Sequence, residues 1–187
     1  MAVVRRGATR PTLPLVAVCA AVVLALVVSA PDGSAAGSKR PRLAPLWATI
    51  NVCDTPSKPN AIGVRGRMSA RSRRTEMYMR FRLRYFDVER GRFVPIRNAV
   101  SPLVYAGRGL RRGRQGGFTF VLDPPRTGYL VRGKAEFFWY RRQRRSGSTR
   151  SGPRVLIKRR ERVTRGGKKR VRGGDPPGYS EGTCDLR

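Results

Sequence analysis

The sequence contains no histidine, few acidic residues and three cysteines. The lack of histidine removes the commonest general base, the usual serine and cysteine triads and most zinc sites. Eleven acidic residues stand against 41 lysines and arginines, which gives a formal net charge of +30. The sequence also lacks an amphipathic helical stretch, an internal repeat and a glycine-rich phosphate loop with its lysine. These absences argue against an enzyme and against a bound cofactor.

The first 36 residues have the layout of a secretory signal. Three arginines in the first ten residues precede an uncharged run from Leu13 to Ala30, and small residues follow. A cationic start, an apolar core and a small-residue cleavage site define such signals. The run is 18 residues long, at the lower limit for crossing a bilayer, so an uncleaved anchor is the alternative. Both interpretations place residues 37–187 outside the cytoplasm, secreted or at the cell surface, and limit membrane contact to this segment.

Two cysteines belong to the exported part of the chain. Cys19 lies within the apolar run, where we interpret it as a small hydrophobic residue, whereas Cys53 and Cys184 follow the signal. An oxidising compartment favours disulfides. We therefore predict a Cys53–Cys184 bond; two separately buried thiols are the alternative.

Acidic residues near these cysteines are the remaining candidates for catalysis. A glycoside hydrolase needs two carboxylates that face each other across a cleft, and a disulfide would gather Asp54, Asp175 and Asp185. However, Asp54 and Asp175 adjoin Thr55 and Pro176, and aspartate commonly shapes turns in such places. We favour the turn interpretation and predict that the protein is not an enzyme and holds no metal.

The remaining chain shows the short alternating runs of a β protein. The clearest run is Met77–Tyr85, in which every second residue is apolar and the others are Tyr78 and three arginines. Such alternation predicts a strand with one buried face. Similar signals predict strands at 46–53, 61–68, 77–85, 93–96, 100–105, 118–122, 129–140 and 155–164. We expect an immunoglobulin-like β-sandwich of about seven strands over residues 46–187, after a linker at 37–45.

The charge is concentrated in this domain. Removal of residues 1–36 leaves 38 basic and 10 acidic residues, a net charge of +28. Arginine far outnumbers lysine, as the codon bias of a GC-rich genome would produce, but that bias does not explain the scarcity of acids. A charge of this size predicts attraction to polyanions.

A basic face is expected where the strands 77–85, 129–140 and 155–164 lie side by side. Their outward residues would bring together cations with Glu136 as the only acid among them. The predicted cations are Arg80, Arg82, Arg84, Arg132 and Lys134, together with Lys158, Arg160 and Arg162 if the last strand keeps register. The predicted aromatic residues on the same face are Tyr78, Phe138 and Tyr140. Arginine binds phosphate and carboxylate in bidentate fashion, and aromatic rings among basic residues suit single-stranded nucleic acid.

Two classes of function follow from this pattern. The first is a non-enzymatic binding or adhesion domain for an anionic polymer, such as envelope phosphates, acidic polysaccharide or extracellular nucleic acid. The second is a structural or protein-interaction domain of the cell surface whose charge is incidental. As an alternative to the basic face, the basic loops at 111–114, 141–145 and 168–172 could equally bind polyanions without an ordered site.

Several short motifs resemble those of uncharacterised exported proteins from actinobacteria. In chain order they are Asn51–Thr55, Ile62–Gly66, Met79–Arg82, Tyr129–Gly133, Phe137–Trp139, Gly174–Ser180 and Thr183–Cys184. The resemblance covers residues 46–187. It implies a secreted β domain bracketed by two cysteines, and it implies no activity and no site residue.

Overall fold

The computed structural model describes residues 42–123, 128–144 and 151–186. The predicted signal segment 1–36 and most of the linker 37–45 lie outside this part. The described residues form strands, turns and loops. Among them there is no helix with the length and apolar character needed to cross a membrane.

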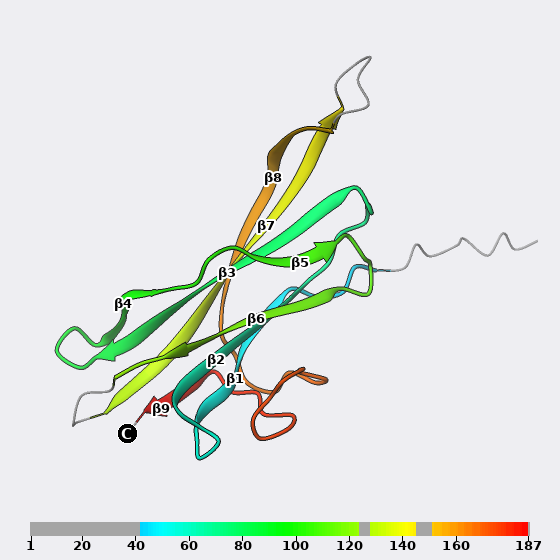
Figure 1. Ribbon diagram of the computed structural model, residues 1–187. Helices are drawn as coiled ribbons and strands as arrows, with labels where there is room; N and C mark the ends of the chain where they lie inside the picture. Colours follow the sequence, from blue (N-terminus) through cyan, green and yellow to red (C-terminus); the bar gives the residue numbers. More distant parts are fainter. Residues whose placement is uncertain (1–41, 124–127, 145–150, 187) are drawn as a thin grey trace, which may run out of the picture. The chain divides into compact units, whose positions relative to one another are not determined.

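Nine strands in the described residues form two antiparallel sheets (Figure 1). Sheet A has the order β1-β2-β6, and sheet B has the order β4-β3-β7-β8, with β5 beside β3 and β9 beside β7. The strands are β1 (Trp47–Thr55), β2 (Lys58–Met68), β3 (Thr75–Asp87), β4 (Arg92–Val100), β5 (Val104–Arg108), β6 (Arg114–Val121), β7 (Tyr129–Arg144), β8 (Ser151–Val163) and β9 (Thr183–Leu186). The prediction of an all-β sandwich is confirmed, and its immunoglobulin-like topology stays a prediction.

Alternating side chains place β3 and β7 at the centre of the core. On β3, the odd-numbered residues from Met77 to Leu83 are fully buried, and the even-numbered residues from Tyr78 to Arg84 are half-buried. Val131, Ala135 and Phe137 repeat the buried pattern on β7. Each large apolar side chain buried in this way stabilises the fold by about 1.5–3 kcal/mol relative to an exposed one. Their partners in sheet A are Ile50, Ile62, Val64, Met68 and Phe120.

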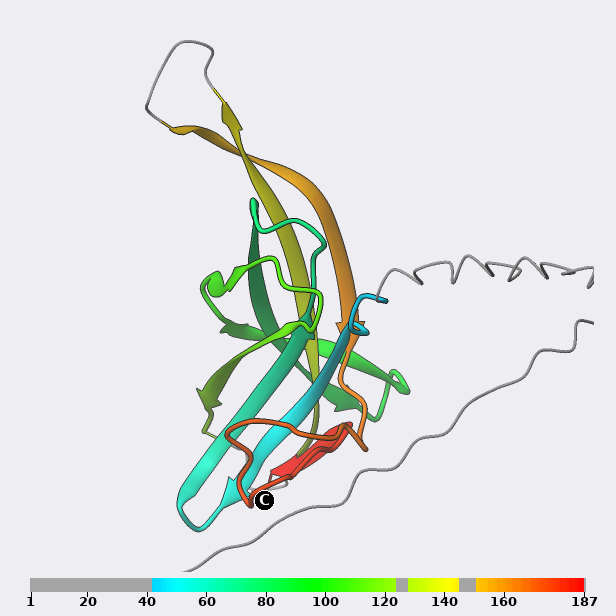
Figure 2. The ribbon, with the colours of Figure 1, turned by 90° about the vertical axis from the view of Figure 1, so that its right-hand side faces the viewer.

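The segment between β8 and β9 covers the free edge of β1 (Figure 2). Ile50 N donates to Glu181 O at 2.9 Å, and Glu181 N donates back to Ile50 O at 3.0 Å. Further along, Asp175 N donates to Asn51 O at 2.8 Å. Unpaired strand edges invite pairing with other chains, so this segment both protects β1 and completes its hydrogen bonding. The same segment brings Cys184 back toward Cys53, as the predicted disulfide requires.

Polar side chains of β1 hold the same segment. Thr49 and Asn51 are buried, which requires partners for their polar atoms. Thr49 Oγ1 lies 2.8 Å from Ser180 Oγ, and Asn51 Nδ2 donates to the Gly173 carbonyl. The outer face of β1 is therefore an internal polar interface rather than a solvated surface.

The predicted disulfide is confirmed. Cys53 and Cys184 are joined with an S–S distance of 2.05 Å and a Cα–Cα distance of 5.5 Å. Cys53 belongs to β1 in sheet A, and Cys184 belongs to β9, which pairs with β7 in sheet B. The bond thus links the two sheets as well as the first strand and the C-terminus.

Several strands differ in extent from the sequence expectation; the strand predicted at 93–96 is Arg92–Val100, and the one predicted at 100–105 is Val104–Arg108. The last long strand was predicted to begin at residue 155, but β8 begins at Ser151, because its pairing with β7 continues to Arg144. The strand β9 was not predicted, since its four residues become a strand only through pairing with the start of β7. Short strands of this kind depend on tertiary partners rather than on a local pattern.

Replacing both disulfide cysteines with alanine is expected to lower the free energy of unfolding by about 3–5 kcal/mol. The reason is that the open chain regains the entropy that closing 131 residues removes. Urea denaturation of the wild type and of Cys53→Ala/Cys184→Ala measures the difference. As a control, dithiothreitol should destabilise the wild type and leave the double variant unchanged. Equal stability of the two proteins would contradict a stabilising role of this bond.

Candidate anion-binding face

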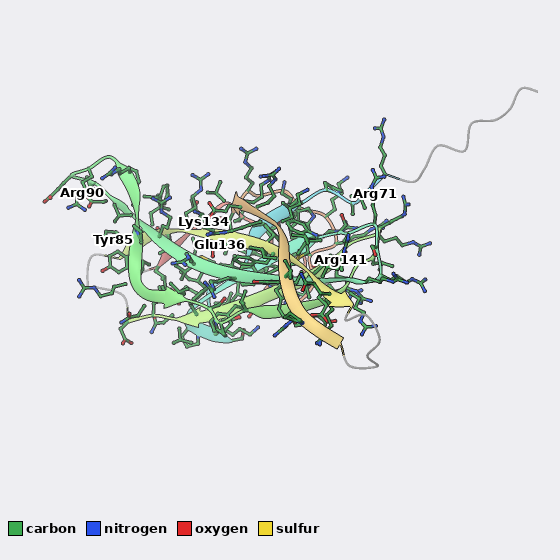
Figure 3. The ribbon with its side chains drawn as sticks, turned by 90° about the horizontal axis from the view of Figure 1, so that it is seen from above. Arg71, Tyr85, Arg90, Lys134, Glu136 and Arg141 are labelled. Carbon is green, nitrogen blue, oxygen red and sulfur yellow. A yellow bond between two sulfur atoms is a disulfide. The ribbon has the colours of Figure 1, made fainter. Side chains whose placement is uncertain are left out.

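Eight of the eleven predicted site residues share the outer face of β3 and β7. Residues directly opposite each other across the two strands are Tyr78 and Phe138, Arg82 and Lys134, and Arg84 and Arg132. Figure 3 shows Lys134 and Glu136 near the middle of the long strands, with Arg90 and Arg71 toward opposite ends of the view. Five of the eight predicted residues on this outer face are cations, and we call them the basic face: Arg80, Arg82, Arg84, Arg132 and Lys134.

The prediction that three cations of β8 join this face is wrong. The three are Lys158, Arg160 and Arg162. They pair with the inward-facing residues of β7, and Lys158 Nζ lies 5.4 Å from the centre of the Trp139 ring. Arg159 and Glu161 take their places on the outer face. A shift of one residue in register moves every side chain of a strand to the other face.

Glu136 is not the only acid on the outer face; Asp185 of β9, opposite Leu130 of β7, lies there too. Glu76 of β3 and Glu161 of β8 join Glu136 there. All three glutamates belong to ion pairs, so the face is a charged network in which cations are in excess. The shortest contacts are Lys134–Glu161 at 2.6 Å, Arg159–Glu136 at 2.7 Å and Arg142–Glu76 at 3.0 Å.

Several arginines of the basic face lack acidic partners. Within the described residues, Arg80, Arg84 and Arg132 form no ion pair with a carboxylate. The Nε atoms of these three and of Arg82 are enclosed and have no hydrogen-bond acceptor there. Arg84 lies directly opposite Arg132, and Arg82 lies opposite Lys134. Like charges directly opposite each other destabilise a sheet, so these two pairs lower the stability of the folded state.

Phe138 supports the basic face from beneath. Although it points outward, it is only 7% exposed, because the guanidinium groups of Arg80 and Arg159 lie over its ring at 5.9 Å and 5.5 Å from the centre. Long arginine side chains commonly cover apolar surface while the charged end stays in water. The ring is therefore not available to stack on a ligand, and its role is to position the two arginines.

A row of tyrosines supplies the accessible aromatic surface. Tyr78 lies 5.1 Å from Tyr105 and 5.5 Å from Tyr140 between ring centres. Tyr105 is 53% exposed and was not among the predicted site residues. Its place on this face follows from the pairing of β5 with β3, which no local pattern in the sequence indicates.

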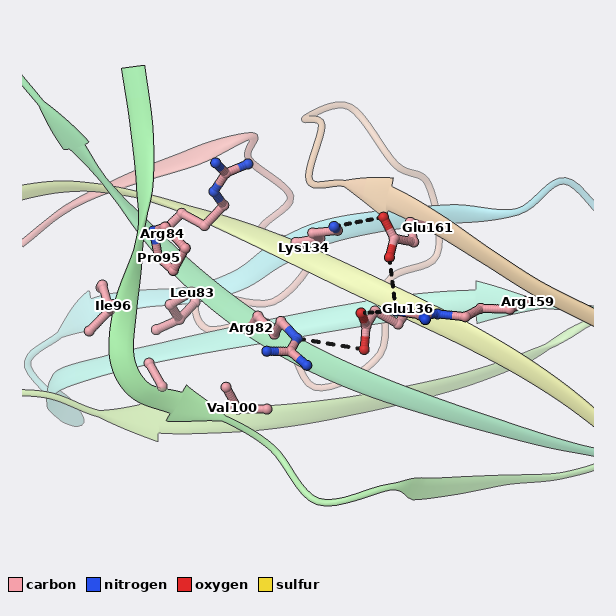
Figure 4. Close-up of a pocket in the computed structure, with 11 residues that line it drawn as sticks. Arg82, Leu83, Arg84, Pro95, Ile96, Val100, Lys134, Glu136, Arg159 and Glu161 are labelled. Atoms are coloured by element: carbon pink, nitrogen blue, oxygen red, sulfur yellow. Dashed lines mark hydrogen bonds and ion pairs between the residues drawn. The ribbon is translucent and has the colours of Figure 1, made fainter. Parts of the chain in front are cut away.

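A cavity of about 340 Å³ opens beside the basic face (Figure 4). Its charged side is formed by Arg82, Arg84, Lys134, Glu136, Arg159 and Glu161. Its apolar side is formed by Leu83, Pro95, Ile96, Ala99 and Val100. The cavity exists because β4 pairs with β3 at Pro95 and next at Val100, and the residues between them leave the ladder as a bulge. Bulges of this kind often lie next to functional sites.

The acids near the disulfide act in turns. Asp54 Oδ1 accepts a hydrogen bond from Asn60 N at 2.7 Å, which closes the turn between β1 and β2. Asp175 accepts hydrogen bonds from Thr55 at 2.8 Å and from Ser57. In the described part of the chain, no three histidine, cysteine or acidic residues are arranged to hold a metal ion.

No protein-family model, curated protein or solved structure matches this chain.

The fold is expected to lose stability at acidic pH. A hydrogen bond from Arg142 lowers the pKa of Glu76 below its ordinary value of 4.5, and one from Lys134 lowers the pKa of Glu161 in the same way. A carboxyl group with a lowered pKa stabilises the folded state above its unfolded pKa, and that contribution disappears as pH falls through the folded pKa. The free energy of unfolding should therefore decline below pH 4.5.

Urea denaturation at a series of pH values measures this decline. The variant Glu76→Gln/Glu161→Gln should lose less stability between neutral and acidic pH than the wild type loses. An equal loss in the two proteins would assign the acid sensitivity to other groups.

The repulsion between Arg84 and Arg132 is measurable in a double-mutant cycle. Each single change to glutamine removes the repulsion, so the sum of the two single effects counts this removal twice. The double variant removes the repulsion once. The loss of unfolding free energy in the double variant should therefore exceed the sum of the two single losses by about 0.2–1 kcal/mol. The excess should shrink as salt is added. A cycle of Arg84 with Arg71, which lies in the loop before β3, should show no coupling. Zero or attractive coupling between Arg84 and Arg132 would contradict the proposed repulsion.

Proposed function

We propose that this chain is an exported, non-enzymatic module that binds an anionic polymer through the basic face. The proposal rests on the pairing of like charges across β3 and β7, the two central strands of the main sheet. Arg84 lies opposite Arg132, and Arg82 lies opposite Lys134. A bound anion converts this unfavourable arrangement into a favourable one, because its negative charge lies beside both cations of a pair and offsets their repulsion.

The geometry suits a polymer better than a single anion. Alternate residues of a strand point to the same face, so Arg80, Arg82 and Arg84 are spaced about 7 Å apart along β3. Arg132 and Lys134 form a second, parallel row on β7. Guanidinium groups bind carboxylate and phosphate in bidentate fashion, and a chain with an acid group on each repeat can contact several of them at once.

The disulfide supports an extracytoplasmic location, because such bonds persist in oxidising compartments. With the predicted signal segment, it favours a protein that acts outside the cytoplasm, at the cell surface or as a secreted protein. The anionic polymers found there include phosphate polymers of the envelope, acidic polysaccharides and extracellular nucleic acid.

The strand β8 favours a second candidate, a protein-interaction domain whose charge is incidental. Residues 153–162 are exposed on both faces, and in the described residues no other strand pairs with the outer edge of β8. Val155, Leu156 and Ile157 form an exposed apolar run on this strand. Exposed strand edges are common sites for the addition of a partner's strand.

Binding to heparin and to duplex DNA across a salt series tests the leading proposal. Affinity should fall steeply with salt, with a log–log slope of about 0.9 for each phosphate contacted on DNA. The variant Arg84→Gln/Arg132→Gln should bind at least about tenfold more weakly at low salt and lower the slope by about one for each arginine that contacts a phosphate.

The matched control is Arg71→Gln/Arg73→Gln, which removes the same charge from the exposed loop before β3. This control should have a much smaller effect than the change on the basic face. Equal effects would indicate diffuse attraction by charge alone. Binding that is indifferent to salt, or no binding to either polymer, would overturn the proposal in favour of the protein-interaction candidate.

A further inference from the structure

We infer that the cavity beside the basic face is a subsite for an acidic sugar residue, so that the anionic polymer is an acidic polysaccharide. The inference rests on the proposed function and adds the chemical class of the ligand. Three features of the cavity carry it: its size and apolar wall, an enclosed acceptor and two arginines whose Nε–H groups have no acceptor among the described residues.

The cavity has the size and the two-sided lining of a sugar site. Its volume of about 340 Å³ lies at the lower end of the range for small-molecule sites, about 300–1,000 Å³. Pro95, Ile96 and Val100 form an apolar wall opposite the charged residues. A pyranose ring has an apolar C–H face and polar edges, and therefore matches such a wall. A phosphate polymer offers no apolar face.

Glu136 has a carboxylate oxygen that can accept a hydrogen bond from the ligand. Its side chain is 3% exposed, and one carboxylate oxygen accepts a hydrogen bond from Arg159 at 2.7 Å. The other oxygen, Oε2, has no hydrogen-bond partner in the described residues. It lies 3.6 Å from Arg82 Nε, which is too long for a hydrogen bond. An enclosed carboxylate oxygen without a donor is costly, and a sugar hydroxyl is a donor of the right kind.

Arg82 and Arg84 supply the site for the acid group of the sugar. Both line the cavity, and the Nε–H group of each lacks an acceptor among the described residues. Lys134 is already held by Glu161 at 2.6 Å, so the two arginines are the cations that a carboxylate would meet. A uronic acid residue carries this carboxylate, the hydroxyl and the apolar face on one ring. Fully ionised polyphosphate carries only the negative charge.

The test compares the affinities of the folded domain for oligogalacturonate and for polyphosphate of equal charge, by calorimetry at one salt concentration. Oligogalacturonate should bind about tenfold more tightly, as one additional charge-assisted hydrogen bond would provide. The variant Glu136→Gln separates the inference from simple electrostatics. Loss of a negative charge should tighten polyphosphate binding, whereas oligogalacturonate should bind more weakly because it loses that charge-assisted bond.

A second pair of variants tests the cavity itself. Val100→Trp fills it from a side chain that is 40% exposed, and Val121→Trp places the same side chain at a 74% exposed position on sheet A. The first change should weaken oligogalacturonate about tenfold and leave polyphosphate unaffected, and the second should change neither. Thermal unfolding of each variant confirms that it is folded.

The outcomes distinguish the inference from the proposed function. Equal affinity for the two probes, or tighter binding of both by Glu136→Gln, would overturn the sugar subsite and leave the proposed function intact. Failure of the wild-type domain to bind either probe would overturn the proposed function.

Discussion

Eleven residue pairs join β3 to β7, and both the core and the basic face depend on this register. Residues that share a position across the two strands point to the same side of the sheet. Met79 therefore lies beside Phe137 in the core, and Arg84 lies beside Arg132 on the surface. The burial of the apolar side stabilises the pairing, and the pairing in turn holds the cations close together against their repulsion.

Acidic residues are distributed so that this repulsion is relieved in part of the face only. Glu76 and Glu161 lie toward the part of the face where β7 pairs with β8, and Glu136 lies under Arg159. At the other end, where Arg84 faces Arg132, no ion pair within the described residues includes either arginine. The outer face thus has a region in which carboxylates pair with the cations and hold their side chains in place. Beside it lies a region with an excess of positive charge. The cavity lies at the border between the two.

The degree to which the sequence predicts each part depends on burial. Alternation in Met77–Tyr85 indicates which side chains point inward, because one face of β3 is packed against sheet A. The same reasoning fails for β8, whose residues 153–162 are exposed on both faces, so that no burial pattern distinguishes Arg159 from Arg160. Tyr105 and the cavity depend on the pairing of β4 and β5 with β3. Such pairings are set by tertiary structure, and a single sequence contains no local signal for them.

The segment that covers β1 has a consequence for the order of folding. The first strand obtains its last hydrogen bonds, its polar side-chain partners and its disulfide from residues near the C-terminus. Contacts so distant in sequence form slowly, and they cannot form before residues 175–184 have been synthesised. A chain that ended before Arg172 would lack the partners of Thr49, Asn51 and Cys53, and the edge of β1 would be open. The first strand is therefore complete only when residues 172–184 are present.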